Sequence, residues 1–105
     1  MTEYEINKAV AEKLDVKVYE RSAGMLFTAT KHRGEYTFTR FDPCNDVQQA
    51  WEIMLANNIS VTKSRGKYIS FYDLRYENPD DGHVAEIETQ DEKPFVAAML
   101  CFLEI

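Results

Sequence analysis

The sequence predicts an α+β fold, a three-layer α-β-α sandwich with a mainly antiparallel sheet and three helices. Apolar residues recur at helical spacing in three segments, at about 2–14, 45–57 and 93–103, and the stretches between them alternate like strands. Short turns join successive strands, which favours antiparallel pairing. Three helices with apolar faces need sheet surface to cover, so we expect helices on both sides of one sheet. We expect one domain over residues 1–105.

The first helix has a clear start signal. Thr2 and Glu5 have the spacing of a capping box, in which each side chain binds the backbone N–H of the other residue. An apolar stripe at a spacing of four residues follows, formed by Ile6, Val10 and Leu14.

Most of the remaining chain is predicted to form strands. Residues 16–19 alternate like a short strand, and residues 25–41 are rich in Phe, Tyr and Thr and predict a hairpin. Its turn is expected at 31–34, where Gly34 can take a positive φ. A second hairpin is expected over residues 59–74, and an edge strand with outward acids over 83–89.

The second helix is expected to open after a turn at residues 42–46, with Pro43 near its first turn. Three residues are candidate N-caps, namely Asp42, Asn45 and Asp46. The sole tryptophan, Trp51, lies on the apolar stripe of this helix and is therefore expected in the core, anchoring the helix to the sheet. The other members of this stripe are Val47, Ala50, Met54 and Leu55.

The last helix contains a nine-residue apolar run, residues 95–103, that is apolar on nearly every side. Such a helix must be covered by the rest of the fold. The run is about half the length of a membrane span, and we expect no membrane-crossing segment. We also find no secretory signal, and Cys44 and Cys101 lack disulfide or metal spacing, so we expect free thiols in the bacterial cytosol.

The negative charge lies in the last third of the chain. Residues 73–105 carry nine acids against two bases, a net of −7, whereas residues 1–72 carry nine acids against ten bases. Such a block repels nucleic acid and favours basic partners. The alternative is that these acids only keep a small protein in solution. As candidate partner-binding residues we select Asp80, Asp81, Glu86 and Glu88.

The residue pattern gives no support for catalysis, a cofactor or a metal. With Gly82 as the sixth residue of a calcium loop, the third is Pro79, which has no side-chain oxygen. Cys44 has no predicted base beside it, because His32 and His83 are expected in or near turns. We therefore expect a protein that is not an enzyme, with no catalytic, cofactor-binding or metal-binding residues.

Two alternative binding functions remain open. The hairpin at 63–76 interleaves bases with aromatics, as RNA-binding strands do, but lacks the aromatic spacing of the RNP1 pattern. A nucleic-acid module would use Lys63, Arg65 and Lys67. A small-ligand domain would need a pocket lined by Trp51, Tyr68 or Tyr72.

Three passages of the chain form a recognisable set. They are Glu5-Ile6-Asn7-Lys8-Ala9-Val10-Ala11-Glu12-Lys13-Leu14, then Phe41-Asp42-Pro43-Cys44-Asn45-Asp46 with Ala50-Trp51-Glu52-Ile53-Met54 and Asn58-Ile59-Ser60-Val61, and finally Pro94, Ala97-Ala98-Met99 and Phe102-Leu103. Together they resemble small enterobacterial phage proteins of the NinX type, in the phage α-β-α sandwich family. The resemblance covers both ends and the middle in order, but not 16–40 or 67–90. It implies a three-layer sandwich in a phage or prophage accessory protein, and it carries over no activity.

Together these observations lead us to expect a non-enzymatic protein that binds a host or phage protein through its acidic surface. A host-defence or nucleic-acid-machinery protein is a candidate partner, whereas nucleic acid itself is not favoured. A homodimer through the strand at 83–89 is a further expectation, opposed by the acids on that strand.

Overall fold

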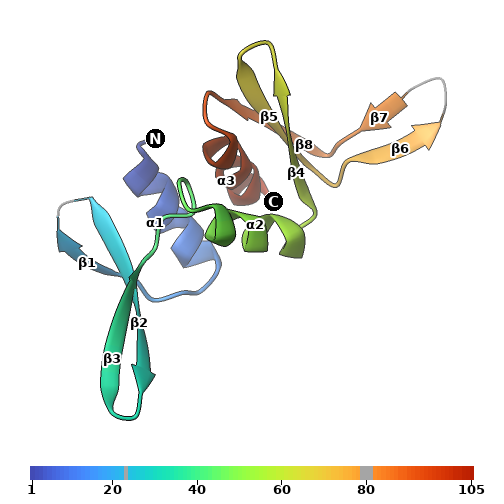
Figure 1. The fold of residues 1–105 in the computed structure, drawn as a ribbon. Helices are drawn as coiled ribbons and strands as arrows, with labels where there is room; N and C mark the ends of the chain where they lie inside the picture. The colour runs from blue at the N-terminus through green and yellow to red at the C-terminus, as the bar shows by residue number, and fades with distance from the viewer. Residues whose placement is uncertain (23, 79–81) are drawn as a thin grey trace.

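The computed structural model describes residues 1–22, 24–78 and 82–105 and confirms an α+β fold with three helices and antiparallel strands (Figure 1). The elements are, in chain order, α1 (Glu3–Lys13), β1 (Tyr19–Ser22), β2 (Met25–His32), β3 (Glu35–Arg40), α2 (Val47–Ala56), β4 (Ile59–Ser64), β5 (Lys67–Tyr72), β6 (Arg75–Asn78), β7 (Gly82–Val84), β8 (Ile87–Asp91) and α3 (Pro94–Glu104).

The helix starts follow the predicted capping signals. Thr2 and Glu5 form the capping box of α1: the Glu5 N–H donates to Thr2 Oγ1 at 3.2 Å and the Thr2 N–H donates to Glu5 Oε1 at 3.0 Å. At α2 the N-cap is Asp46, whose carboxylate accepts from the Gln49 N–H at 3.0 Å. Pro43 lies in the turn that precedes this helix.

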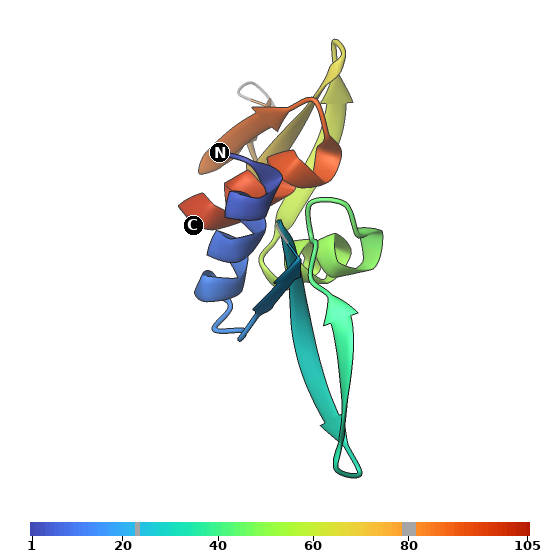
Figure 2. The same cartoon turned by 90° about the vertical axis from the view of Figure 1, so that its left-hand side faces the viewer.

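Helix α3 lies at the centre of the fold. It packs against α1, α2, β4, β5 and β8, and Figure 2 shows it crossing α1. The Lys13 ammonium donates to the carbonyl oxygens of Phe102 and Ile105, both at 2.7 Å, where a positive charge complements the helix dipole. The apolar run is therefore covered, as predicted; its buried residues are Val96, Ala97, Ala98, Met99, Cys101 and Phe102.

The strands divide between two three-stranded sheets, in the orders β1-β2-β3 and β4-β5-β8, and a two-stranded ribbon of β6 and β7. All the pairs are antiparallel, as predicted. We expected one sheet, whereas the two hairpins lie in separate sheets. The reason is that α2 separates them in the chain and each packs on a different helix: β2 on α1, and β4 and β5 on α3.

The β2–β3 hairpin projects away from the helices, and we call it the arm. Arg33 and Gly34 form its two-residue turn, with φ values of 52° and 82°, which confirms the predicted turn. Every residue of β3 is exposed, and among the described strands β3 pairs only with β2. The Phe38 ring also lies against the side chains of Tyr19 and Arg21 from β1. The arm makes the molecule elongated, with extents of 58 × 27 × 19 Å (Figure 2).

The region after β5 differs from the predicted strands. The strand expected to continue through residue 74 ends at Tyr72, because Asp73 has a φ of 54° and the chain bends there. Asn58 holds this bend, accepting from the Asp73 N–H at 3.0 Å and donating to its carboxylate at 2.9 Å. The single strand expected over 83–89 is two strands, β7 and β8, in different sheets. The short strand expected at 16–19 begins only at Tyr19.

Candidate functional site

The prediction that Trp51 lies in the core is wrong. Trp51 is 54% exposed, and Val47 and Leu55, four residues before and after it, are 64% and 65% exposed. The side of α2 that packs inward is formed by Ala50, Ile53 and Met54. We call Val47, Trp51 and Leu55 the outer stripe. Helical spacing identifies an apolar face but does not say whether another element covers it.

The outer stripe borders a groove of about 430 Å³ between α2, β4 and the first turn of α3. Its lining is mostly apolar, with Ser60 as the polar exception. The residues that line it are Val47, Trp51, Met54, Leu55, Ile59, Ser60, Val61 and Phe95. Tyr68 and Tyr72, which we considered with Trp51 as lining residues for a small-ligand pocket, do not line this groove.

The strand beside the groove is an edge strand. β4 pairs with β5 along all six of its residues and with no other described strand, so one side of its backbone is free. Its register with β5 is regular, without a bulge, and it contains no proline. Proteins often protect such edges with bulges, prolines or charges, and here Lys63 is the only charge on the strand. The groove therefore combines an apolar surface with unpaired backbone groups.

The four predicted partner-binding residues are placed only in part. Asp80 and Asp81 lie outside the described residues. The Glu86 carboxylate lies 3.5 Å from the Arg75 guanidinium and is 57% exposed, and Glu88 is exposed on β8. β8 is the edge of its sheet opposite β4. We call Glu86 and Glu88 the acidic edge. They lie at the edge of the sheet opposite the one that borders the groove.

The passage at 41–46, which is one of the passages that carry the family resemblance, forms a partly buried polar junction between helices. The Asn7 side-chain amide donates to Asp42 at 2.8 Å, and its oxygen accepts from the Cys44 N–H at 3.2 Å. Asn45 donates to Glu3 at 2.7 Å, and Lys93 contacts both residues, at 3.2 Å and 3.0 Å. This network joins the N-terminal ends of α1 and α3 to the loop before α2.

The environment of Cys44 opposes nucleophilic chemistry. The residue is buried, and burial, with the nearby negative charges of Glu3 and Asp42, raises the pKa of its thiol to about 12. Burial also raises the pKa of the Cys101 thiol. Both cysteines are free, as predicted. A thiol with so high a pKa stays protonated at neutral pH.

A polar hollow of about 470 Å³ lies at the start of α3, lined by Glu3, Lys67, Gln90, Asp91, Glu92 and Lys93. Glu3 and Lys93 pair with each other there, and the Asp91 carboxylate accepts from the Lys93 N–H at 2.8 Å. Within residues 1–22, 24–78 and 82–105, no group of three or more His, Cys, Asp or Glu side chains could hold a metal ion. No helix in this part of the chain is long and apolar enough to cross a membrane.

The bases of the alternative nucleic-acid surface lie together at the end of the β4–β5 hairpin. Arg65 is in its two-residue turn between Lys63 and Lys67, and the Lys63 ammonium lies 6.0 Å from the centre of the Tyr68 ring. This arrangement is compatible with solvated charges at a turn, and nucleic-acid binding stays a prediction.

Sequence reasoning missed the groove, although α2 contains a signal for it. This helix has two apolar stripes, one formed by residues 47, 51 and 55 and the other by residues 50, 53 and 54. Together they are wider than the single apolar face that a helix needs to pack on one neighbour. Two stripes on one helix indicate two covering surfaces. In this fold only the second stripe is covered.

The fold and the groove define a small α+β protein built around a central C-terminal helix, with an uncovered apolar surface beside a strand edge. Over residues 1–104 the chain matches the model of the family described as "Bacteriophage P22, NinX", and it belongs to that family. The resemblance found in the sequence is thereby confirmed. Neither the curated proteins nor the solved structures contain a match.

Proposed function

We propose that this phage protein acts without catalysis, by binding another protein in the cytosol of the bacterial host. The observation that carries the proposal is the outer stripe of α2, left uncovered beside the free edge of β4. Three large apolar side chains at more than half exposure, contiguous with a groove, form a surface of the kind that marks interaction sites. Tryptophan is also among the residues that contribute most to binding energy at interfaces.

The chemistry of the groove selects an extended partner segment. A strand laid along β4 would satisfy the free backbone groups of this edge, and its alternate side chains would enter the apolar groove. The partner is therefore a segment in extended conformation with apolar residues at every second position. Backbone hydrogen bonds would supply affinity, and the fit around Trp51 would supply selectivity.

The acidic edge is a second surface through which the same function could recognise a basic partner. It supports the proposal because Glu86 and Glu88 are exposed on the sheet edge opposite the groove. Exposed carboxylates mainly steer and orient a partner, whereas buried apolar contacts supply more of the affinity. We therefore assign the main contact to the groove.

The test compares capture of host and phage proteins by the wild type, by Trp51→Glu and by Val16→Glu. Val16 is also an exposed apolar residue, but it does not line the groove, so it controls for the added charge. We expect at least one protein that the wild type and Val16→Glu capture and Trp51→Glu loses. Equal capture of every protein by all three forms would refute binding through the groove.

The contribution of the acidic edge is tested separately with Glu86→Lys and Glu88→Lys, together with charge reversal of Asp80 and Asp81. We expect these changes to weaken capture of a basic partner by slowing association, an effect that grows at low salt. Capture unchanged at low salt would remove the acidic edge from the binding surface.

A further inference from the structure

We infer that the segment that fills the groove is β3 of a second copy of this chain, so that two copies exchange arms around a two-fold axis. This inference rests on the groove being the docking surface proposed above and names its occupant. Five observations carry it: two vacant strand edges of equal length, the direction of their free backbone groups, the side chains that these groups bring together, the placement of the arm, and the exposed apolar area.

The chain has a second vacant edge besides β4. β3 pairs only with β2 among the described strands, and all six of its residues are exposed. Phe38 is 42% exposed and Tyr36 63% exposed on one face of this strand. β1 pairs with β2 only as far as Phe27, so the outer part of the arm has two strands, and such a ribbon gains stability from a third strand. β4 also has six residues, so the two edges match in length.

The accessible free backbone groups of β4 belong to Val61 and Lys63, because Ile59, which also faces outward, is only 7% exposed. Ser64 and Lys67 flank a two-residue turn and so form a hydrogen-bonded pair, and in antiparallel pairing such pairs recur at every second residue. The next hydrogen bond fits this rule, because the Asp73 N–H donates to the carbonyl of Asn58, which is also an even-numbered residue. Even-numbered residues of β4 therefore face β5, and odd-numbered residues face outward.

The free backbone groups of β3 belong to Tyr36 and Phe38. His32 and Glu35 flank the turn of the arm, and the Phe41 N–H donates to the carbonyl of Leu26, so the odd-numbered residues of this strand face β2. Arg40 also faces outward, but its carbonyl already accepts from the Gln49 side chain at 2.8 Å. Two residues of each edge are thus available for pairing.

One antiparallel register joins these groups, with Phe38 opposite Val61 and Tyr36 opposite Lys63. Residues directly opposite each other project from the same face of a sheet. Val61 lines the groove, so the same register that pairs the backbones brings the Phe38 ring to the groove beside Trp51. Backbone pairing and apolar contact select one alignment.

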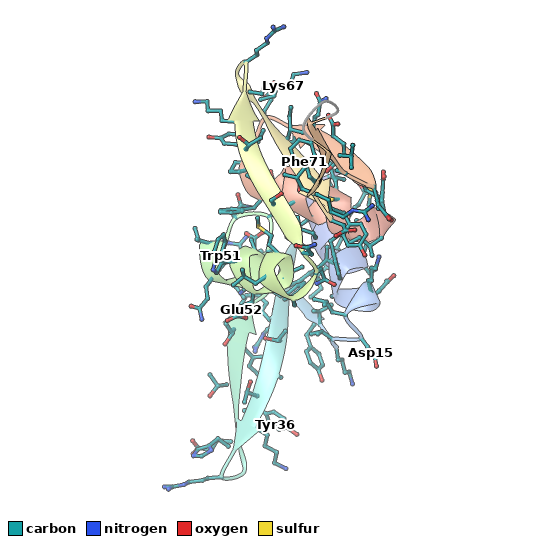
Figure 3. The ribbon with its side chains drawn as sticks, turned by 90° about the vertical axis from the view of Figure 1, so that its right-hand side faces the viewer. Asp15, Tyr36, Trp51, Glu52, Lys67 and Phe71 are labelled. Carbon is teal, nitrogen blue, oxygen red and sulfur yellow. The ribbon has the colours of Figure 1, made fainter. Side chains whose placement is uncertain are left out.

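The position of the arm allows both copies to pair at once. The arm and the β4–β5 hairpin extend from the level of α2 in opposite directions, as the positions of Tyr36 and Lys67 show (Figure 3). β3 runs toward α2 and β4 runs away from it. A two-fold axis beside α2 and perpendicular to the arm therefore sets β3 of each copy antiparallel to β4 of the other, in an isologous interface.

Exposed aromatic side chains supply a substantial part of the area that such a dimer needs. A stable interface covers about 800 Å² of each partner, against a total surface of 7030 Å² here. Tyr36, Phe38 and Trp51, at 63%, 42% and 54% exposure, supply roughly 300 Å² of that if a ring residue exposes about 200 Å² when free. Val47, Leu55 and the two strand backbones add to it.

Charge opposes this pairing, which gives it a measurable signature. The far ends of both hairpins are basic, with Lys31 and Arg33 on the arm and Arg65 and Lys67 on the other. Salt screens such repulsion, with a Debye length of about 8 Å at physiological ionic strength. We expect dimerisation to strengthen as salt rises. Dimerisation that weakens steeply with salt would overturn the inference.

The first experiment measures mass by light scattering and the fluorescence of Trp51, the only tryptophan. We expect the wild type to have twice its chain mass of 12.2 kDa, with tryptophan emission that shifts to the blue as protein concentration rises. Phe38→Glu should weaken dimerisation by about 30-fold or more. Thr37→Glu places the same charge on the opposite face of the strand and should leave the dimer intact. Circular dichroism checks that each variant folds.

The second experiment tests the register with a disulfide. In this register Thr37 lies opposite Thr62, and both are exposed, whereas the native cysteines are buried. The double variant Thr37→Cys/Thr62→Cys should form a covalent dimer on mild oxidation, since Cα atoms of such a pair are about 4.5 Å apart. The shifted variant Thr39→Cys/Thr62→Cys is the control. Equal cross-linking of both variants, or none, would overturn the inference.

The outcomes separate this inference from the proposed function. A monomeric wild type refutes the second copy and leaves the groove to the capture test with Trp51→Glu. A dimer that survives Phe38→Glu but not Trp51→Glu shows that the groove docks a different segment. In that case the proposed surface stands and β3 is not its occupant.

Discussion

The side-chain amide of Asn7 donates a hydrogen bond of 2.8 Å to the carboxylate of Asp42, and both residues are buried. They lie 35 residues apart in the chain, so this contact fixes the first helix against the loop that leads into the second. Because the Asn7 oxygen accepts from the Cys44 N–H, both ends of the amide are used. Buried polar groups are costly when they lose a partner.

We expect Asn7→Leu to lower the free energy of unfolding by about 2–3 kcal/mol, because it removes the buried donor to Asp42 and the acceptor of the buried Cys44 N–H. Urea denaturation followed by circular dichroism measures this change. Lys8→Ala, at an exposed position of the same helix, serves as the control and should stay within about 0.5 kcal/mol of the wild type. If Asn7→Leu lowered the unfolding free energy by no more than the Lys8→Ala control, water would be replacing the hydrogen bonds of the amide.

A second prediction concerns the two sides of α2. Met54 is buried and Trp51 is half exposed. Met54→Ala should cost about 2–5 kcal/mol of unfolding free energy, as is typical of buried methionines. Trp51→Ala should cost far less in the isolated monomer, within about 1 kcal/mol. Measured at a concentration where the protein is monomeric, equal losses would mean that the tryptophan is part of the core after all.

The acid dependence of stability provides a third prediction. The Asn45 amide, and then Lys93, hydrogen-bond to Glu3 and hold the pKa of its carboxyl below the ordinary value of 4.5. A lowered pKa in the folded state contributes stability above the unfolded value, and this contribution is lost as pH falls through the folded value. The stability difference between wild type and Glu3→Gln should therefore shrink below about pH 4.5.

The order of the two causes is testable by NMR titration of the Glu3 carboxyl. Asn45→Ala should raise its pKa toward the ordinary value more than Lys93→Met does, since the Asn45 hydrogen bond is the larger cause. The reverse order would assign the effect to charge and not to the amide.

A fourth prediction concerns the thiols. Both cysteines are buried and their pKa values are raised, that of Cys44 to about 12. A thiol reagent at pH 8 should react slowly with the native protein and rapidly with two thiols in urea. Because the folded Cys44 pKa lies above the unfolded one, near 9.0, stability should also fall as pH rises above that value. One fast-reacting thiol in the native state would contradict the burial of Cys44.

The predictable parts of the fold were those set by local rules. The capping box at Thr2, the turn at Gly34 and the burial of the last helix follow from short-range geometry and from apolar pattern. The division into two sheets does not, because the sequence does not state which helix each hairpin will meet. The bend at Asp73 depends on its contact with Asn58, fifteen residues away, which no local pattern records.

The candidate site was predictable only in its composition. The sequence analysis selected Trp51 as a core anchor and as a candidate lining residue of a pocket. Helical spacing alone predicted that it is buried, because apolar stripes are usually covered. The acidic residues were also selected from composition. Asp80 and Asp81 lie outside the described residues, and the carboxylate of Glu86 lies beside Arg75. A surface site such as the groove arises where no other element covers an apolar face, and the residue pattern of one helix does not show whether such cover exists.

The opposite placement of β4 and β8 in their sheet has a consequence for assembly. A copy engaged through one edge still presents Glu86 and Glu88 at the other, so a pair of joined copies carries two identical anionic rims. A target with two basic sites could bind both rims, and its second contact would form at a high effective concentration. Modest attraction at each rim would then suffice for durable capture, and separating the pair would release the target.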